Sequence, residues 1–179
     1  MSEMLEIRIH GRGGQGGKKL SKLIAQAAFM EGKWCQSFAL YGAERRGAPV
    51  MSFVRIDDMP IELRGYITNP NVVIVLDDSL KDIATEGLKE NGIYIINTEN
   101  ITISESDTID VHCIDATKIA MDVMGKNIVN TTMIGAFAKT TGIITLENAL
   151  QAIRMEFSKL PDKVIELNVE CARRAYEEV

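Results

Sequence analysis

Cysteine and histidine are scarce in this chain of 179 residues, which has three of the first and two of the second. No two cysteines stand in a Cys-x-x-Cys spacing, the kind of close spacing that iron–sulfur clusters and structural zinc sites use. His10 and His112 each fall at or within a predicted strand, without a second ligand at metal-binding spacing. We therefore expect no metal site, core or rim histidines, and reduced, mostly buried thiols, as in a cytosolic protein.

An excess of basic charge and long apolar runs are also missing. The net charge is -5, whereas a nucleic-acid-binding domain is normally basic. No segment approaches the roughly 18 apolar residues of a membrane span, and residues 1–4 lack the basic and apolar regions of a signal peptide. With 46% hydrophobic and 25% charged residues, residues 1–179 are expected to form one cytoplasmic domain without a membrane or nucleic-acid partner.

Glycine, in contrast, is concentrated near the start, where residues 11–17 include five glycines. An alternating strand, Leu5 to Ile9, precedes this stretch, and a helix-periodic segment follows it. Glycine tolerates the positive φ angles of such a sharp turn, and the N–H groups at a helix start favour an anion. We expect this turn to contact a ligand. Its candidate binding residues are Gly11, Gly13, Gly14, Gln15 and Gly16.

The turn matches known nucleotide-binding patterns only in part. Three of its glycines fit G-x-G-x-x-G between a strand and a helix. This fingerprint needs an acidic residue at the end of the second strand, but the predicted strand Trp34 to Phe38 is followed by Ala-Leu-Tyr. A P-loop needs Ser or Thr where Lys19 stands. A turn without NAD or ATP is therefore favoured, whereas contact with some other anion and a purely structural turn both stay open.

A second candidate segment carries three consecutive charges, Glu44, Arg45 and Arg46, before Gly47 and Pro49. Two arginines beside a glycine can bind a carboxylate or a phosphate. A solvated loop and an ion pair inside the subunit are the alternatives. If this loop and the glycine turn both follow strands at their carboxyl ends, the two lie at the same edge of the sheet and form one site.

The remaining pattern predicts an α/β protein with three layers, α/β/α, around a mixed, mostly parallel, Rossmann-like sheet. An alternating strand at residues 50–56, a turn and a return at residues 61–63 predict a hairpin. A continuous apolar run at residues 72–76 predicts a buried strand that ends in Asp77 and Asp78. These two carboxylates either orient a ligand or cap a helix. Ser79 is the expected cap of a helix at residues 80–89. Further strands are expected at residues 93–96 and 111–114, and four helices from residue 116 onward. The helix around residue 133 is apolar on too many sides for a surface element, and the nine methionines suggest that some of the surface contacts another protein.

Three segments together resemble one family, the gamma subunits of the 2-oxoacid:ferredoxin oxidoreductases, which include pyruvate synthase. They are Gly11-Arg-Gly-Gly-Gln-Gly16, Tyr41-Gly-Ala-Glu-Arg-Arg-Gly-Ala-Pro49 and Asn130-Thr-Thr-Met-Ile-Gly-Ala136. The resemblance extends over nearly the whole chain and is greater to pyruvate and branched-chain members than to 2-oxoglutarate members. Gly17 departs from it, because an apolar residue is expected there.

The resemblance implies a multi-subunit enzyme that converts a 2-oxoacid, coenzyme A and oxidised ferredoxin to acyl-coenzyme A, CO2 and reduced ferredoxin. In such enzymes thiamine diphosphate and 4Fe-4S clusters carry the chemistry. This chain has neither a Gly-Asp-Gly motif nor a cysteine cluster, so we expect both cofactors in alpha, beta and delta-type partner subunits. The chain itself is expected to have no catalytic residue, to be inactive alone, and to complete the assembly or border the coenzyme A site. The resemblance favours pyruvate as the 2-oxoacid, and the alternatives are the gamma subunit of a branched-chain 2-oxoacid or 2-oxoglutarate member, a stand-alone dinucleotide-binding oxidoreductase and a scaffold.

Overall fold

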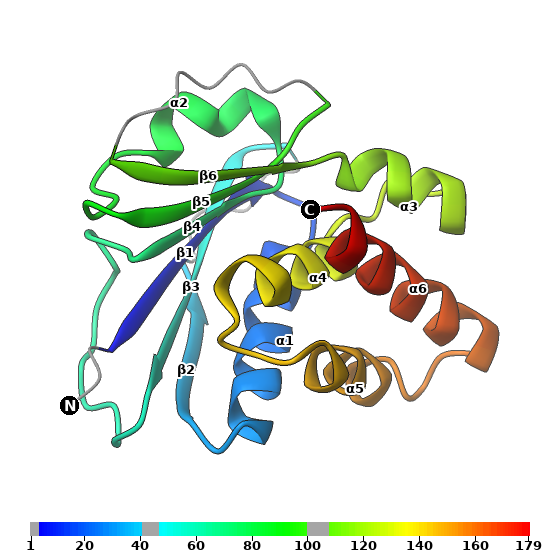
Figure 1. The fold of residues 1–179 in the computed structure, drawn as a ribbon, viewed down its shortest axis with the longest axis horizontal. Coiled ribbons are helices and arrows are strands. Elements are labelled where there is room, and N and C mark those ends of the chain that lie inside the picture. Colours follow the sequence, from blue (N-terminus) through cyan, green and yellow to red (C-terminus); the bar gives the residue numbers. More distant parts are fainter. Residues whose placement is uncertain (1–3, 41–46, 100–107) are drawn as a thin grey trace.

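A six-stranded mixed sheet forms the centre of the protein (Figure 1). The computed structural model describes residues 4–40, 47–99 and 108–179. The strand order is β2-β3-β1-β4-β5-β6, with β1, β4, β5 and β6 parallel and β3 antiparallel to both β1 and β2. The strands are β1 (Leu5–Arg12), β2 (Trp34–Ala39), β3 (Pro49–Asp57), β4 (Val72–Val75), β5 (Gly92–Asn97) and β6 (Ile109–Ile114). The predicted α/β class with a mixed, mostly parallel sheet is confirmed.

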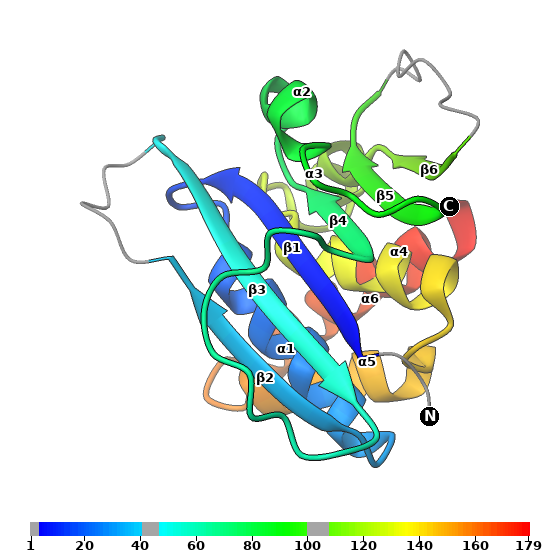
Figure 2. The ribbon, with the colours of Figure 1, turned by 90° about the vertical axis from the view of Figure 1, so that its left-hand side faces the viewer.

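The helices cover the two faces of the sheet unequally (Figure 1). One face carries α1 (Gly17–Met30), α3 (Ala116–Met124), α4 (Asn130–Thr141), α5 (Leu146–Glu156) and α6 (Asp162–Glu178). The other face carries the short 3-10 helix η1 (Asp78–Leu80) and α2 (Lys81–Ala84), and the segment at residues 58–71 crosses it in front of β2 and β3 (Figure 2). The larger apolar core lies beneath the five helices, and a small second core lies beneath α2.

Helix α4 lies in the interior of the helical layer, where residues 130–138 are all buried. Its Gly135 lets α6 approach so closely that a Cβ there would stand 1.9 Å from the carbonyl oxygen of Ala172. The apolar character of this helix therefore comes from packing inside the chain. The prediction that this helix is too apolar for a surface element is confirmed.

Two local predictions also need correction. No strand forms at residues 61–63, which are half-buried or exposed; β3 instead pairs with β1 and β2. The predicted helix at residues 80–89 ends already at Ala84. The buried guanidinium of Arg8 binds the carbonyl oxygens of Ala84 and Glu86, and a longer helix would need these oxygens for its own amides.

Among the described residues, no helix combines the length and the apolar character needed to cross a lipid bilayer.

Candidate functional site

The three sequence motifs meet at the carboxyl end of β1. The amide of Gly13 donates to the carbonyl oxygen of Ala48 at 2.9 Å, and the amide of Gly47 donates to that of Gly13 at 3.3 Å. Asn130, which opens the third motif, packs against the Cα of Gly16. β1 and β2 both run antiparallel to β3, so their carboxyl ends share one edge of the sheet, as expected. Glu44, Arg45 and Arg46 lie outside the described residues, and their part in the site stays a prediction.

Glycine is favoured in this turn for two reasons, a positive φ angle and a lack of space for a Cβ. Gly14 and Gly16 have φ angles of 98° and 85°, which residues with a Cβ rarely adopt. A Cβ on Gly16 would lie 2.4 Å from Nδ2 of Asn130, whereas a Cβ on Gly14 would meet nothing within 4 Å. Gly11 belongs to β1, where it is buried against Leu76. The turn is thus packed at Gly16 and open to its surroundings at Gly14.

Gln15 holds the turn to the next strand connection. Its Oε1 accepts from the amide of Arg12 at 2.7 Å, and its Nε2 donates to Oδ2 of Asp77 at 2.8 Å. Asp77 also accepts from the amide of Ser79 at 3.1 Å and so caps η1. Asp77 therefore caps this helix, which was one of the two roles considered for it. The prediction of Ser79 as the cap is wrong, because Ser79 donates its amide to Asp77.

The carboxyl of Asp77 is held in its ionised form. Burial by itself would raise its pKa, but hydrogen bonds from Ser79 and Gln15 and the charge of Arg12 together lower the pKa below its ordinary value. The Asp77 side chain therefore carries a full negative charge at neutral pH beside the turn.

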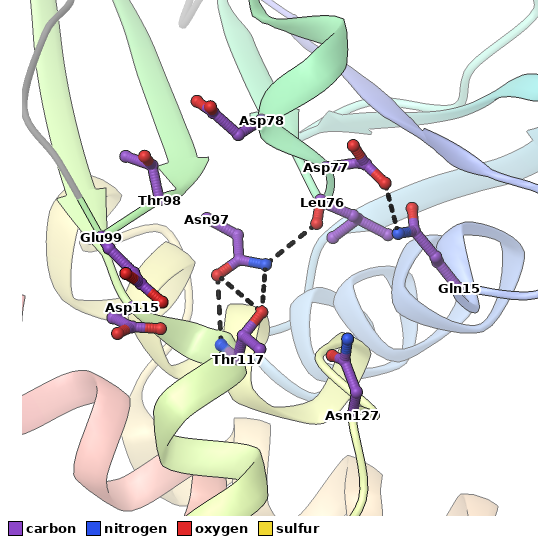
Figure 3. Close-up of a pocket in the computed structure, with 10 residues that line it drawn as sticks. All are labelled: Gln15, Leu76, Asp77, Asp78, Asn97, Thr98, Glu99, Asp115, Thr117 and Asn127. Carbon is purple, nitrogen blue, oxygen red and sulfur yellow. Dashed lines mark hydrogen bonds between the residues drawn. The ribbon is translucent and has the colours of Figure 1, made fainter.

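A cleft of about 360 Å³ lies beyond Gln15 and Asp77, at the carboxyl ends of β4 and β5 (Figure 3). The amide of Asn97 crosses its floor, donating to the carbonyl oxygen of Leu76 and to Oγ1 of Thr117, each at 3.0 Å. Four carboxylates line this cleft, those of Asp77, Asp78, Glu99 and Asp115. Such a concentration of negative charge repels an anion.

Gly14 and the first turn of α1 do not line this cleft, and their main-chain amides are a more favourable place for an anion. The first hydrogen bond of this helix runs from Leu20 to the carbonyl oxygen of Gly16, so the amides before it have no partner within the helix. The positive end of the helix dipole adds to this attraction. The arrangement fits a phosphate or carboxylate approaching the open Gly14.

The side chain of Lys19, in the first turn of α1, pairs with a carboxylate of its own chain. Its Nζ binds Glu156 at 3.0 Å and lies over the ring of Phe157. Arg12 belongs to the first motif but was not among the binding residues predicted from the sequence. Its partners, Gly47, Asp77 and Ser79, are 35 to 67 residues away in the chain, and no local pattern identifies them.

No group of three or more potential ligand side chains is placed to hold a metal ion in the described parts of the chain. His10 is buried and accepts a hydrogen bond from Nε of Arg8 at 2.8 Å. It is thus a core histidine, as predicted.

The sequence family described as pyruvate ferredoxin/flavodoxin oxidoreductase matches residues 6–178. The chain belongs to this family. Pyruvate synthase subunit PorC of Methanothermobacter thermautotrophicus is 46% identical over 178 residues, covering 98% of this chain and 96% of that protein.

Other members of the pyruvate ferredoxin/flavodoxin oxidoreductase family agree in length and fold. The pyruvate/ketoisovalerate oxidoreductases common subunit gamma of Thermococcus litoralis is 45% identical, with 97% of this chain and 96% of that protein covered. The crystal structure of pyruvate oxidoreductase subunit PORC from Thermotoga maritima superimposes with a TM-score of 0.85 at 38% identity, over 98% of this chain and 97% of that chain. This chain is accordingly the gamma subunit of a multi-subunit 2-oxoacid:ferredoxin oxidoreductase, and the resemblance inferred from three motifs is confirmed.

Proposed function

We propose that this gamma subunit serves a pyruvate:ferredoxin oxidoreductase and that its glycine turn borders the coenzyme A site. The first part is supported by relatives that cover nearly the whole chain and are named as pyruvate synthase subunits. The relative from Thermococcus litoralis is named as common to pyruvate and ketoisovalerate oxidoreductases. One gamma chain of that kind serves two 2-oxoacids, so we assign recognition of the 2-oxoacid side chain to other subunits.

The observation that carries the second part is the open Gly14 next to the first turn of α1, whose amides precede the first hydrogen bond of the helix. Among the three reactants, coenzyme A carries phosphates, the groups that backbone amides at a helix start bind best. Gly13, Gly14 and Gly16 would shape this contact, and Gln15 would fix it. Arg45 and Arg46, with Glu44 beside them, would add guanidinium groups from the loop whose end contacts Gly13.

Thiamine diphosphate and the 4Fe-4S clusters belong, in this proposal, to partner subunits of the alpha, beta and delta types, which also receive ferredoxin. The chain supplies neither a Gly-Asp-Gly motif nor a cysteine cluster. The assembled enzyme is proposed to be cytoplasmic. The chain's own contribution is to complete the assembly and to orient coenzyme A.

The test is steady-state kinetics of the complete complex carrying Gly14→Ala or Arg46→Ala, with pyruvate and coenzyme A varied separately. We expect a higher KM for coenzyme A, an unchanged KM for pyruvate, and normal values for the control Arg154→Gln, whose guanidinium pairs with Glu166 on the helical layer. An unchanged KM for coenzyme A in both variants would refute the placement.

The isolated chain should reduce no acceptor from pyruvate and coenzyme A. NAD should bind it weakly, because no carboxylate ends the second strand. Micromolar NAD affinity by calorimetry, about -8 kcal/mol, would instead favour a dinucleotide-binding oxidoreductase.

A further inference from the structure

Arg12 joins three segments of the chain that are distant in sequence. Its Nη1 donates to the carbonyl oxygen of Gly47 at 2.9 Å, at the start of the segment leading into β3. Its Nε and Nη2 donate to Oγ of Ser79 at 3.1 and 2.7 Å. The same guanidinium lies 3.5 Å from Oδ2 of Asp77. One side chain from the glycine turn thus holds both the Gly47 segment and the connection from β4 to η1.

These contacts close a ring of four residues. The main-chain amide of Arg12 binds Gln15, Gln15 binds Asp77, Asp77 accepts from the hydroxyl of Ser79, and that hydroxyl accepts from the Arg12 side chain. A serine hydroxyl offers one donor and two acceptor sites, and here the donor and both acceptor sites are used. A ring in which each group holds the next resists displacement of any one member.

We propose that Arg12 is a positioning residue: it holds the Gly47 segment and the Asp77 connection against the glycine turn, and it does not bind the anion itself. This inference rests on the proposed coenzyme A site. Its consequence is that Asp77 and Ser79 determine how well the turn receives coenzyme A.

The contacts of Arg12 favour a positioning role over direct binding of the anion by its charge. Three of its five N–H groups already have acceptors in the described part of the chain. Its positive charge is compensated by the ionised carboxylate of Asp77. A phosphate at Gly14 would gain little from a guanidinium whose charge is already paired.

The substitution Asp77→Asn separates the two roles by the direction of its effect. An amide Nδ2 at the position of Oδ2 cannot accept from Gln15 or compensate Arg12, so the ring opens. If Arg12 positions the turn, the KM for coenzyme A rises. If Arg12 binds the anion directly, removal of the competing carboxylate frees its charge and the KM for coenzyme A falls.

The experiment measures kcat and KM for coenzyme A in the complete oxidoreductase complex. The variants are Arg12→Gln, Ser79→Ala and Asp77→Asn, and thermal unfolding of each complex confirms that it is assembled. Misplacement of a binding element by about 1 Å costs up to 100-fold, so we expect KM increases of about tenfold with nearly unchanged kcat. Ser79→Ala removes only an exposed hydroxyl, which keeps the test valid if Arg12→Gln fails to assemble.

Two controls separate this inference from the proposed function. Arg154→Gln removes an arginine of similar exposure, since 41% of its side chain is accessible compared with 35% for Arg12, and it should change neither constant. Arg12→Lys keeps the charge but loses the branched contact to Gly47 and Ser79. Its KM for coenzyme A should therefore lie between that of the unaltered enzyme and that of Arg12→Gln. If Gly14→Ala raises the KM and the ring variants do not, the inference is refuted and the proposed function stands. A lower KM in Asp77→Asn refutes the inference equally. If Gly14→Ala and Arg46→Ala both leave the KM for coenzyme A unchanged, the proposed function itself is refuted.

Discussion

Replacement of Gly16 by alanine should destabilise this protein more than the same replacement two residues earlier. Both glycines have positive φ angles, 98° at Gly14 and 85° at Gly16, and a residue with a Cβ pays about 1 to 2 kcal/mol for such a conformation. The two sites differ in what the new methyl group meets. At Gly14 it meets nothing within 4 Å, and at Gly16 it would stand 2.4 Å from Nδ2 of Asn130.

The additional cost at Gly16 follows from this distance. Ordinary contacts of a Cβ begin near 3.4 Å, so Asn130 must move by about 1 Å, and overpacking of this kind costs about 1 to 3 kcal/mol. Asn130 cannot move without loss, because it is buried and its Oδ1 accepts from the amide of Thr131 at 2.8 Å. We expect Gly14→Ala to lower the free energy of unfolding by about 1 to 2 kcal/mol and Gly16→Ala by about 2 to 5 kcal/mol.

Urea unfolding of the isolated chain, followed by circular dichroism, measures both values. The double variant Gly16→Ala/Asn130→Ala removes the obstructing side chain, so its loss of stability should be smaller than the sum of the two single losses by about 1 to 3 kcal/mol. Equal losses for Gly14→Ala and Gly16→Ala, or strictly additive losses in the double variant, would show that the first and third motifs do not pack as described.

Two further predictions concern packing and pH. Gly135→Ala places a Cβ 1.9 Å from the carbonyl oxygen of Ala172, so α4 and α6 must separate and the free energy of unfolding should fall by about 3 kcal/mol. The control is Gly17→Ala in α1, whose new Cβ would lie 3.6 Å from Oγ of Ser52 and should cost no stability. Similar losses for the two variants in urea unfolding would contradict this prediction. Burial and the charge of Arg8 lower the pKa of His10 from 6.5 to about 4. As the pH falls, His10 of the unfolded chain therefore takes up a proton at a higher pH than His10 of the folded chain, and the free energy of unfolding should fall by about 2 kcal/mol between about pH 7.5 and about pH 5. Denaturation across this pH range should show no such loss in His10→Gln.

Elements with local signals could be predicted from the sequence. Gly125 and Gly142 end α3 and α4 in the left-handed conformation, with φ angles of 66° and 61°, and Thr145 caps α5 by accepting from the amide of Asn148. Each signal lies within a few residues of the boundary that it sets, and for this reason the four helices expected from residue 116 onward are all found.

Elements that depend on distant partners could not be predicted. The alternation of residues 50–56 indicates a strand but does not say which neighbour it pairs with, so the pairing of β3 with β1 and β2 was missed. The end of α2 at Ala84 depends on Arg8, 76 residues away.

The features of the candidate site likewise divide into those with a local sequence signal and those that depend on distant residues. Glycines required by local backbone geometry, such as Gly14 and Gly16, are visible in the sequence. The contacts of Arg12 with Gly47 and Ser79 join residues 35 and 67 positions apart. The contact with Gly47 follows from the antiparallel pairing of β1 with β3, and the contact with Ser79 from the parallel pairing of β1 with β4. Both become visible only in the fold.

Hydrogen–deuterium exchange of the assembled oxidoreductase, with and without coenzyme A, tests the central claim most directly. If the glycine turn receives a phosphate of coenzyme A, the amides of residues 13–19 should exchange more slowly when it is bound. Peptides from α6, which packs against α3, α4 and α5, should exchange at the same rate in both states. Equal exchange of residues 13–19 with and without coenzyme A, in an enzyme saturated with it, would contradict the account.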